Sequence, residues 1–308
     1  MRAMRIRLVF LLAALTSTLA SCSAVTRIGV HFLYRRAELP SAQVVRDVCY
    51  LDNPDCDTGK HRLDFYLPQG KHWPVLVFVH GGGWNTGDKL LRVGGADVYA
   101  NIGRYFATQG IGVAVINYRL LPGTDWRGQL VDVRQAVRWV RAHAAGYGGR
   151  TDALFLMGHS AGGWLSSYVA LDTTRGHETP VRGVVCVSGA GLDLTDSLTY
   201  ALGESRDYYV QRFQSGPTDR DWPVEASPVL RVTSAAPPFL ILYAGGEKKA
   251  LQRQAQVLER ALASSGMERS VVVVPGESHS RMVLTLSRPG KVSVPAILAF
   301  IRAHTPDE

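Results

Sequence analysis

Two stretches decide the fold of this chain: His80-Gly81-Gly82-Gly83-Trp84 and Gly158-His159-Ser160-Ala161-Gly162-Gly163. Each directly follows an apolar run, at 74–79 and 153–157, that predicts a buried strand. The second stretch contains the pattern G-x-S-x-G, which is typical of a tight turn between a strand and a helix that lifts a serine hydroxyl clear of the sheet. Both stretches together, in this order and each after a strand, predict a hydrolase of esters or amides.

The glycines of both stretches have a steric purpose. A Cβ atom at Gly158 or Gly162 would press on the neighbouring strand and helix while the serine between them holds a strained conformation. The triple-glycine run is typical of a loop that presents backbone N–H groups to a developing oxyanion. A flexible glycine turn is the simpler interpretation, but the flanking His80 and Trp84 favour the oxyanion loop.

Ser160 is the predicted nucleophile, and the alternative is a serine that only caps the helix beginning at residue 161. The backbone N–H of Ala161 is expected to be one oxyanion donor, helped by the positive end of the helix that it opens. Gly82 and Gly83 are expected to supply the other donors.

The base is expected late in the chain, because this kind of site runs serine, then acid, then histidine. Only His279 and His304 follow the strand predicted at 238–244. His304 lies in the charged tail, where we expect it to be solvated, whereas His279 lies in a loop after the apolar run 271–274 and is the predicted base. His80 is expected to hold the glycine loop by hydrogen bonds and not to act as the base.

The acid is expected directly after the strand at 238–244. Glu247 is the first carboxylate there, and its alternative is a surface glutamate that begins a helix. Asp193 or Asp196, after the strand predicted at 181–187, is the other candidate for the acid.

The N-terminus predicts an exported protein. Three arginines precede a short apolar stretch at 8–15, and Leu19-Ala20-Ser21-Cys22 resembles the lipobox of bacterial lipoproteins. We therefore expect residues 1–21 to be a lipoprotein signal peptide, Cys22 to be lipidated, and 22–40 to be a membrane-proximal spacer. Ser23 resembles the residue of lipoproteins sent to the outer membrane, so the predicted location in the bacterial cell envelope is the outer membrane, facing the periplasm. An ordinary cleaved signal peptide is the alternative.

In an oxidising compartment, Cys49 and Cys56 are expected to form a disulfide across a short turn, with two free thiols as the alternative. Cys186 lies in a buried apolar run and is expected to be a small core residue. The formal net charge of +8 includes three arginines of the signal segment, and no basic block is interleaved with aromatic residues. This distribution argues against a nucleic-acid partner.

From residue 74 onward, strand and helix patterns alternate. Strands are predicted at 74–79, 111–117, 153–158, 181–187, 238–244 and 270–274, and helices at about 97–109, 128–145, 161–171, 250–264 and 292–303. This alternation predicts one domain over 41–308, with a mostly parallel sheet covered by helices on both faces and an antiparallel hairpin at its start. The stretch 189–237 breaks the rhythm and is expected to be a cap over the site.

With these residues in place, the chain resembles the α/β-hydrolase superfamily over roughly 60–303. The nearest likeness is to its HGGG(W) carboxylesterases: the hormone-sensitive-lipase-like esterases, isoprenylcysteine methylesterase and kynurenine formamidase. Further shared features are Asn117-Tyr118-Arg119-Leu120 with Pro122, Tyr147-Gly148-Gly149 and Pro237-Pro238. The resemblance implies the α/β-hydrolase fold and the same roles for Ser160, His279, Gly82 and Gly83. Relatives usually carry an aspartate where this chain has Glu247.

The sequence therefore predicts a lipid-anchored serine carboxylesterase with a Ser160-His279-Glu247 triad, a small-molecule ester as substrate, and no metal or organic cofactor. An amidase or formamidase with the same residues is one alternative. A non-catalytic envelope lipoprotein that uses the fold for binding is the other.

Overall fold

The computed structural model describes residues 34–51, 56, 59–174 and 179–307. The predicted signal segment, Cys22 and the first part of the expected spacer lie outside these residues. Residues 34–40 pack against helix α2 (Val98–Thr108): the Asn101 amide accepts a hydrogen bond from the Ala37 N–H at 2.7 Å and donates one to the Arg35 carbonyl at 2.9 Å. The end of the expected spacer is therefore part of the domain.

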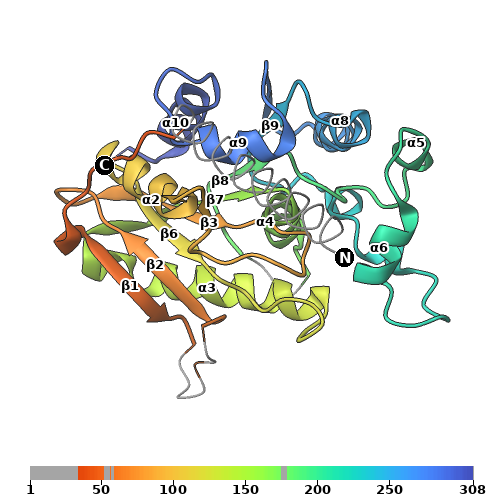
Figure 1. The fold of residues 1–308 in the computed structure, drawn as a ribbon, viewed down its shortest axis with the longest axis horizontal. Helices are drawn as coiled ribbons and strands as arrows, with labels where there is room; N and C mark the ends of the chain where they lie inside the picture. Colours follow the sequence, from red (N-terminus) through yellow and green to blue (C-terminus); the bar gives the residue numbers. More distant parts are fainter. Residues whose placement is uncertain (1–33, 52–55, 57–58, 175–178, 308) are drawn as a thin grey trace, which may run out of the picture.

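The core of the molecule is an eight-stranded sheet with the order β1-β2-β6-β3-β7-β8-β9-β10 (Figure 1). Its strands are β1 (Val44–Cys49), β2 (Arg62–Tyr66), β3 (Trp73–Val79), β6 (Gly112–Ile116), β7 (Gly149–His159), β8 (Gly183–Val187), β9 (Phe239–Ala244) and β10 (Arg269–Val274). The pairings of β1 with β2 and of β2 with β6 are antiparallel, and the other five are parallel. This confirms the predicted hairpin and the mostly parallel sheet.

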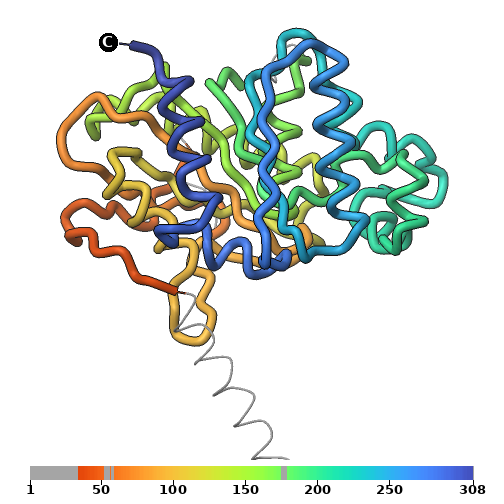
Figure 2. Tube along the Cα trace, turned by 90° about the horizontal axis from the view of Figure 1, so that it is seen from above, coloured from red at the N-terminus to blue at the C-terminus, as the bar shows by residue number. Residues whose placement is uncertain are grey.

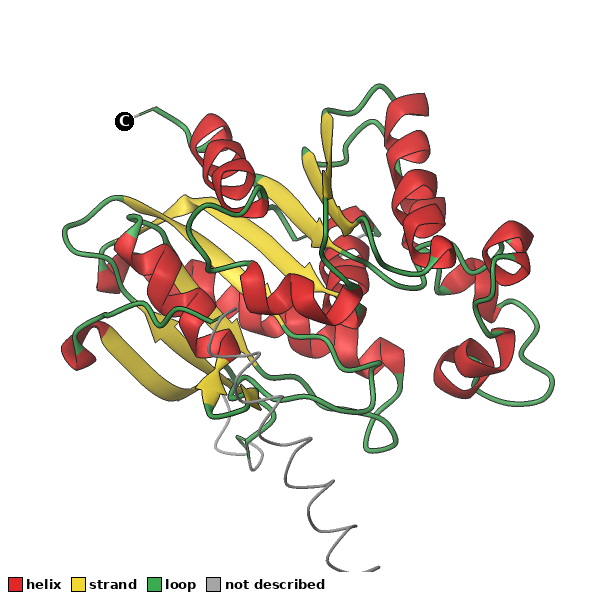
Figure 3. Ribbon diagram, turned by 45° about the horizontal axis from the view of Figure 1, so that its top comes forward, coloured by secondary structure: helices red, strands yellow, loops and turns green. Residues whose placement is uncertain are grey.

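Helices cover both faces of this sheet (Figure 3). They are α2, α3 (Trp126–Tyr147), α4 (Ala161–Leu171), α8 (Lys249–Ser264), α9 (His279–Thr285) and α10 (Ser293–His304). Alternate residues of β3 belong to separate apolar clusters, with Val75 and Val77 packed in one and Leu76 and Phe78 in the other. The first cluster includes α3, α4 and α8, and the second includes α2, α9 and α10. The period of two along a strand produces these two cores.

The stretch 189–237 forms a lobe that projects from one side of the body (Figure 2). It contains α5 (Ser197–Ala201), α6 (Arg206–Phe213), α7 (Trp222–Glu225) and a 3-10 turn, Pro228–Arg231. Buried aromatic rings attach the lobe to the body, because Phe213 packs against Trp84, Trp126 and Trp164 with ring centroids 4.9–6.1 Å apart. Aromatic pairs at such distances stabilise an interface beyond the area that they bury.

Three local features differ from the sequence prediction or add to it. His279 was expected in a loop but is the first residue of α9, which is too short to show a clear helical period. His304 was expected to be solvated, but it ends α10, where its ring bonds the Phe300 carbonyl and the Glu268 carboxylate. A small hairpin, β4 (Arg92–Val93) with β5 (Ala96–Asp97), was not predicted.

The three described cysteines lie as predicted. Cys49 and Cys56 form a disulfide, and Cys186 is a buried free thiol in β8. Burial raises the pKa of the Cys186 thiol to about 11, so it stays protonated at neutral pH. Among the helices of the described residues, none has both the length and the apolar character that crossing a bilayer requires.

Candidate active site

The Ser160 turn has the strained geometry that its glycines allow. Ser160 stands between β7 and α4 with φ 57° and ψ −120°, a conformation that L side chains rarely adopt. A Cβ atom on Gly158 would lie 2.0 Å from the Gly162 carbonyl oxygen, and one on Gly162 would lie 2.1 Å from the Val79 carbonyl oxygen. Both clashes involve backbone atoms that side-chain movement cannot relieve. The steric reason predicted for these glycines is therefore confirmed.

The glycine loop after β3 lies against the Ser160 turn, because β3 and β7 are neighbouring parallel strands. A Cβ atom placed on Gly81 would be 3.3 Å from the Ser160 Cβ. Gly82 and Gly83 both have positive φ, at 123° and 59°. Within the described part of the chain, the N–H groups of Gly82, Gly83 and Ala161 donate to no acceptor. Three unpaired N–H donors therefore lie in the segments that meet at Ser160.

His80 holds the glycine loop, as predicted. Its Nδ1 donates to the Gly81 carbonyl at 2.7 Å, and its ring stacks on Tyr118 with centroids 4.4 Å apart. Complete burial lowers the pKa of His80 to about 4, so the ring is neutral at working pH. This buried, neutral ring agrees with the prediction that His80 does not act as the base.

A hydrogen bond joins His279 and Glu247 at the edge of the sheet where the Ser160 turn also lies. The His279 Nδ1 and the Glu247 Oε2 are 3.0 Å apart, and the glutamate side chain is fully buried. The two loops are also tied by the Gly246 N–H, which donates to the Glu277 carbonyl at 2.9 Å. Parallel pairing of β9 with β10 brings them together, because Ala244 lies opposite Val274 just before both loops begin.

The two aspartates considered as alternative acids have other partners. Asp193 Oδ1 accepts hydrogen bonds from the N–H and the hydroxyl of Thr195. Asp196 caps α5 and pairs with Arg253, and these contacts hold its pKa at about 2. The geometry therefore places Glu247, and neither aspartate, on His279.

His159 connects the parts of the site, and sequence reasoning did not single it out. Its Nε2 donates to the His279 carbonyl at 2.9 Å, and its Nδ1 would be 3.2 Å from a Cβ atom on Gly81. Burial, with a contribution from His279, lowers the pKa of His159 to about 3, so the donating ring stays neutral. Its place as the first x of G-x-S-x-G was the signal that could have identified it.

Among the contacts of the described residues, Ser160 and His279 do not share a direct hydrogen bond. Such a bond often tightens only in the complex with substrate. His159 is instead the link between the two, since it directly precedes Ser160 in the chain and bonds the His279 backbone.

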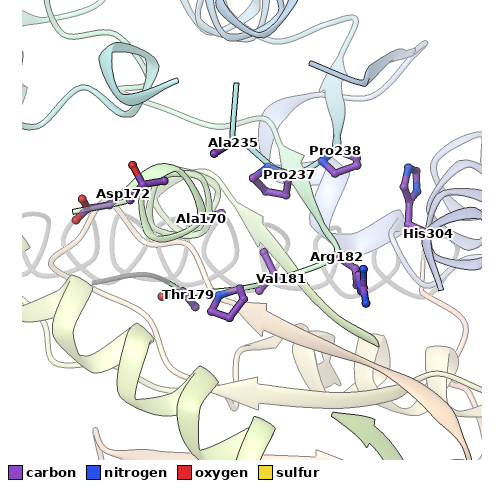
Figure 4. A pocket seen from close by; sticks show the side chains of 11 residues that line it. Ala170, Asp172, Thr179, Val181, Arg182, Ala235, Pro237, Pro238 and His304 are labelled. Atoms are coloured by element: carbon purple, nitrogen blue, oxygen red, sulfur yellow. The ribbon is translucent and has the colours of Figure 1, made fainter. Parts of the chain in front are cut away.

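A metal ion would need a cluster of ligating side chains, and a further small ligand would need a cavity. Residues 34–51, 56, 59–174 and 179–307 contain no cluster of three or more histidines, cysteines or carboxylates that could hold a metal ion. A cavity of about 470 Å³ is lined by Ala170, Arg182, Pro238 and His304, among others (Figure 4). Those residues lie where β8 and β9 begin, at the opposite end of the sheet from Ser160.

Comparison with known proteins identifies esterases as relatives. The BD-FAE family model matches residues 63–262, which include both glycine stretches and Glu247. Esterase LipC of Mycobacterium tuberculosis is 30% identical over 243 residues, covering 75% of this chain and 59% of LipC. A probable isoprenylcysteine alpha-carbonyl methylesterase of Oryza sativa is 33% identical over 148 residues, covering 47% of this chain and 31% of that protein. The chain therefore spans less than two thirds of these relatives.

Solved structures show the same fold. A truncated carbohydrate esterase from gut microbiota superposes with a TM-score of 0.72 at 20% identity, over 87% of this chain and 99% of that one. Esterase B from Lactobacillus rhamnosis, inhibited by a tributyrin phosphonate, gives a TM-score of 0.72 at 22% identity, over 96% and 95% of the two chains. These similarities confirm the predicted α/β-hydrolase architecture.

Proposed function

This chain belongs to the BD-FAE family, and from that membership we propose that it is a serine carboxylic-ester hydrolase. The observation that carries the proposal is the buried Glu247 carboxylate 3.0 Å from His279 Nδ1. It lies beside a strained Ser160 and three backbone N–H groups that have no acceptor among the described residues. A nucleophile, a base with its orienting acid, and oxyanion donors are the parts that acyl transfer requires. The names of the relatives, esterases and methylesterases, support an ester as the substrate.

The proposed reaction begins when Ser160 Oγ attacks the ester carbonyl carbon and His279 Nε2 takes the hydroxyl proton. Because Glu247 accepts the hydrogen bond of the Nδ1–H, Nε2 is the nitrogen with a free lone pair. The oxygen of the tetrahedral intermediate receives the N–H groups of Gly82, Gly83 and Ala161.

The intermediate then collapses, the carbon–oxygen bond to the alcohol breaks, and His279 returns its proton to the leaving alcohol. A water molecule attacks the resulting acyl-serine with the same proton transfers, and the acid is released. The chemistry balances with water alone as the second substrate.

We also propose that the protein is anchored in the bacterial envelope through lipid on Cys22, facing the periplasm. The support is the lipobox-like Leu19-Ala20-Ser21-Cys22 and the disulfide between Cys49 and Cys56, which suits an oxidising compartment.

A fluorophosphonate probe tests the enzyme proposal, since it labels only an activated serine. We expect labelling of the wild type and none of Ser160→Ala, whereas an unlabelled wild type would favour a binding protein. A panel of p-nitrophenyl esters and aryl formamides then decides between an esterase and an amidase. We expect turnover of the esters, and a preference for formamides of tenfold or more would overturn the ester assignment.

A further inference from the structure

Helix α6 of the 189–237 lobe, which the sequence predicts to be a cap, is hydrogen-bonded directly to the glycine loop. The Nε of Arg212 donates to the Gly83 carbonyl oxygen at 3.0 Å, and its Nη1 donates to the Tyr208 carbonyl at 2.8 Å. The guanidinium also lies over the Tyr208 ring, 3.5 Å from its centroid. One arginine thus holds both the oxyanion loop and the tyrosine one turn before it on α6.

The hydroxyl of Tyr208 lies beside Gly83. A Cβ atom on Gly83 would be 2.5 Å from the Tyr208 hydroxyl oxygen, so this oxygen occupies the space that a side chain at residue 83 would fill. Tyr208 is half-buried. Among the described residues no acceptor receives the hydroxyl proton, and Arg212 has only donors to offer it.

We propose that the Tyr208 hydroxyl is a side-chain donor of the oxyanion hole and that Arg212 is its positioning residue. The inference rests on the proposed function, because it assigns a further group to that same reaction. The Gly83 N–H belongs to the loop proposed to receive the oxyanion, and the Tyr208 hydroxyl lies on the Cβ side of Gly83, with no acceptor for its proton among the described residues. A donor held in place before the reaction stabilises the developing charge at little cost of reorganisation.

The chemistry of the hydroxyl suits this role. Burial raises the pKa of Tyr208, and the nearby Arg212 offsets only part of the rise, so the hydroxyl keeps its proton at neutral pH. The cation over the ring also polarises the phenol, which strengthens it as a donor.

In this proposal the lobe formed by residues 189–237 contributes to catalysis through α6. If the cap helix moves away from the body, the Arg212 bond to Gly83 and the Tyr208 donor are lost together. Full oxyanion stabilisation is then available only when α6 is seated on the loop.

Tyr208→Phe tests the proposal because it removes one oxygen atom and keeps the ring under Arg212. With p-nitrophenyl acetate we expect kcat to fall about 10²-fold while KM changes less than threefold, as for the loss of one oxyanion donor. Tyr200→Phe is the matched control: its hydroxyl donates to the Leu194 carbonyl within the cap, so we expect a lower melting temperature and unchanged kcat.

Arg212 is tested by Arg212→Gln and Arg212→Lys. We expect kcat to fall in Arg212→Gln, and to recover in part in Arg212→Lys, which can still donate to the Gly83 carbonyl but cannot stack as a plane. A loss of stability without a change in kcat in these variants would overturn the positioning role.

Two failures are distinguishable. A wild type that neither turns over esters nor takes the fluorophosphonate label overturns the proposed function and this inference with it. A wild type that does both, with a Tyr208→Phe variant of equal kcat or one that differs only in KM, overturns the inference alone.

Discussion

Replacing Glu247 by glutamine tests the centre of the proposed mechanism with almost no change in volume. The carboxylate is fully buried 3.0 Å from His279 Nδ1, and it opposes the positive charge that the imidazole carries in the transition state. Two unit charges about 4 Å apart attract by about 4 kcal/mol at an effective dielectric constant of about 20. Since each 1.36 kcal/mol is a factor of ten in rate, losing this attraction lowers kcat about 10³-fold.

The glutamine amide adds a second loss. Its NH₂ group can donate to Nδ1 and stabilise the wrong tautomer, in which Nε2 carries the proton and cannot act as a base. In a serine protease the equivalent change costs about 10⁴ in turnover. We therefore expect kcat of Glu247→Gln on p-nitrophenyl acetate to be about 10³–10⁴ below that of the wild type, with the fold retained.

Two control variants separate this effect from the loss of any buried carboxylate. Glu277 is equally buried but pairs with Lys291, so Glu277→Gln should lower the melting temperature and leave kcat per folded molecule unchanged. Asp193→Asn removes the other candidate acid and should also keep kcat. Glu247 is not the acid if Asp193→Asn lowers kcat by orders of magnitude while the kcat of Glu247→Gln stays within tenfold of the wild type.

Four further predictions concern the nucleophile, the Ser160 turn, the stability of the fold at low pH and the lipid anchor. Ser160→Ala should remove on the order of 10⁶ in turnover with the fold intact, and a purified variant that retains a tenth of the activity would contradict this. Gly162→Ala should lower the free energy of unfolding by about 3 kcal/mol or more, because its Cβ would lie 2.1 Å from a backbone oxygen of β3. Urea denaturation measures this loss, and a midpoint equal to that of the wild type would contradict the predicted clash. Burial lowers the pKa of His80 to about 4 and of His159 to about 3, so below pH 6.5 these histidines bind protons in the unfolded state but not in the native state. Lowering the pH from 8 to 5 should therefore reduce the free energy of unfolding by about 2 kcal/mol for each histidine. Equal denaturation midpoints at the two pH values would rule this out. Cys22→Ser should leave uncleaved precursor or release soluble protein on membrane fractionation, and equal solubility of variant and wild type would argue against the anchor.

The fold and the strained turn at Ser160 could be predicted from the sequence because their signals are local. The steric demand at Gly158 and Gly162 depends on a turn of a few residues, so the pattern around Ser160 identifies it directly. Apolar runs of strand length, alternating with helical periods, indicate a parallel sheet without knowledge of its strand order. Alternating polar and apolar residues predicted the hairpin, and the expected oxidising compartment predicted the disulfide across its turn.

What only the tertiary structure decided involves groups that are distant in the chain. Glu247 and Asp193 both follow strands, and the pairing of β9 with β10 selects Glu247 because it brings that loop to His279. The bond from His159 to the His279 carbonyl and the approach of Tyr208 to Gly83 span more than 100 residues each. Such contacts depend on the strand order and on how the 189–237 lobe packs against the body. A local sequence pattern does not encode them, because side chains far apart in sequence meet only after the sheet and its helices have assembled.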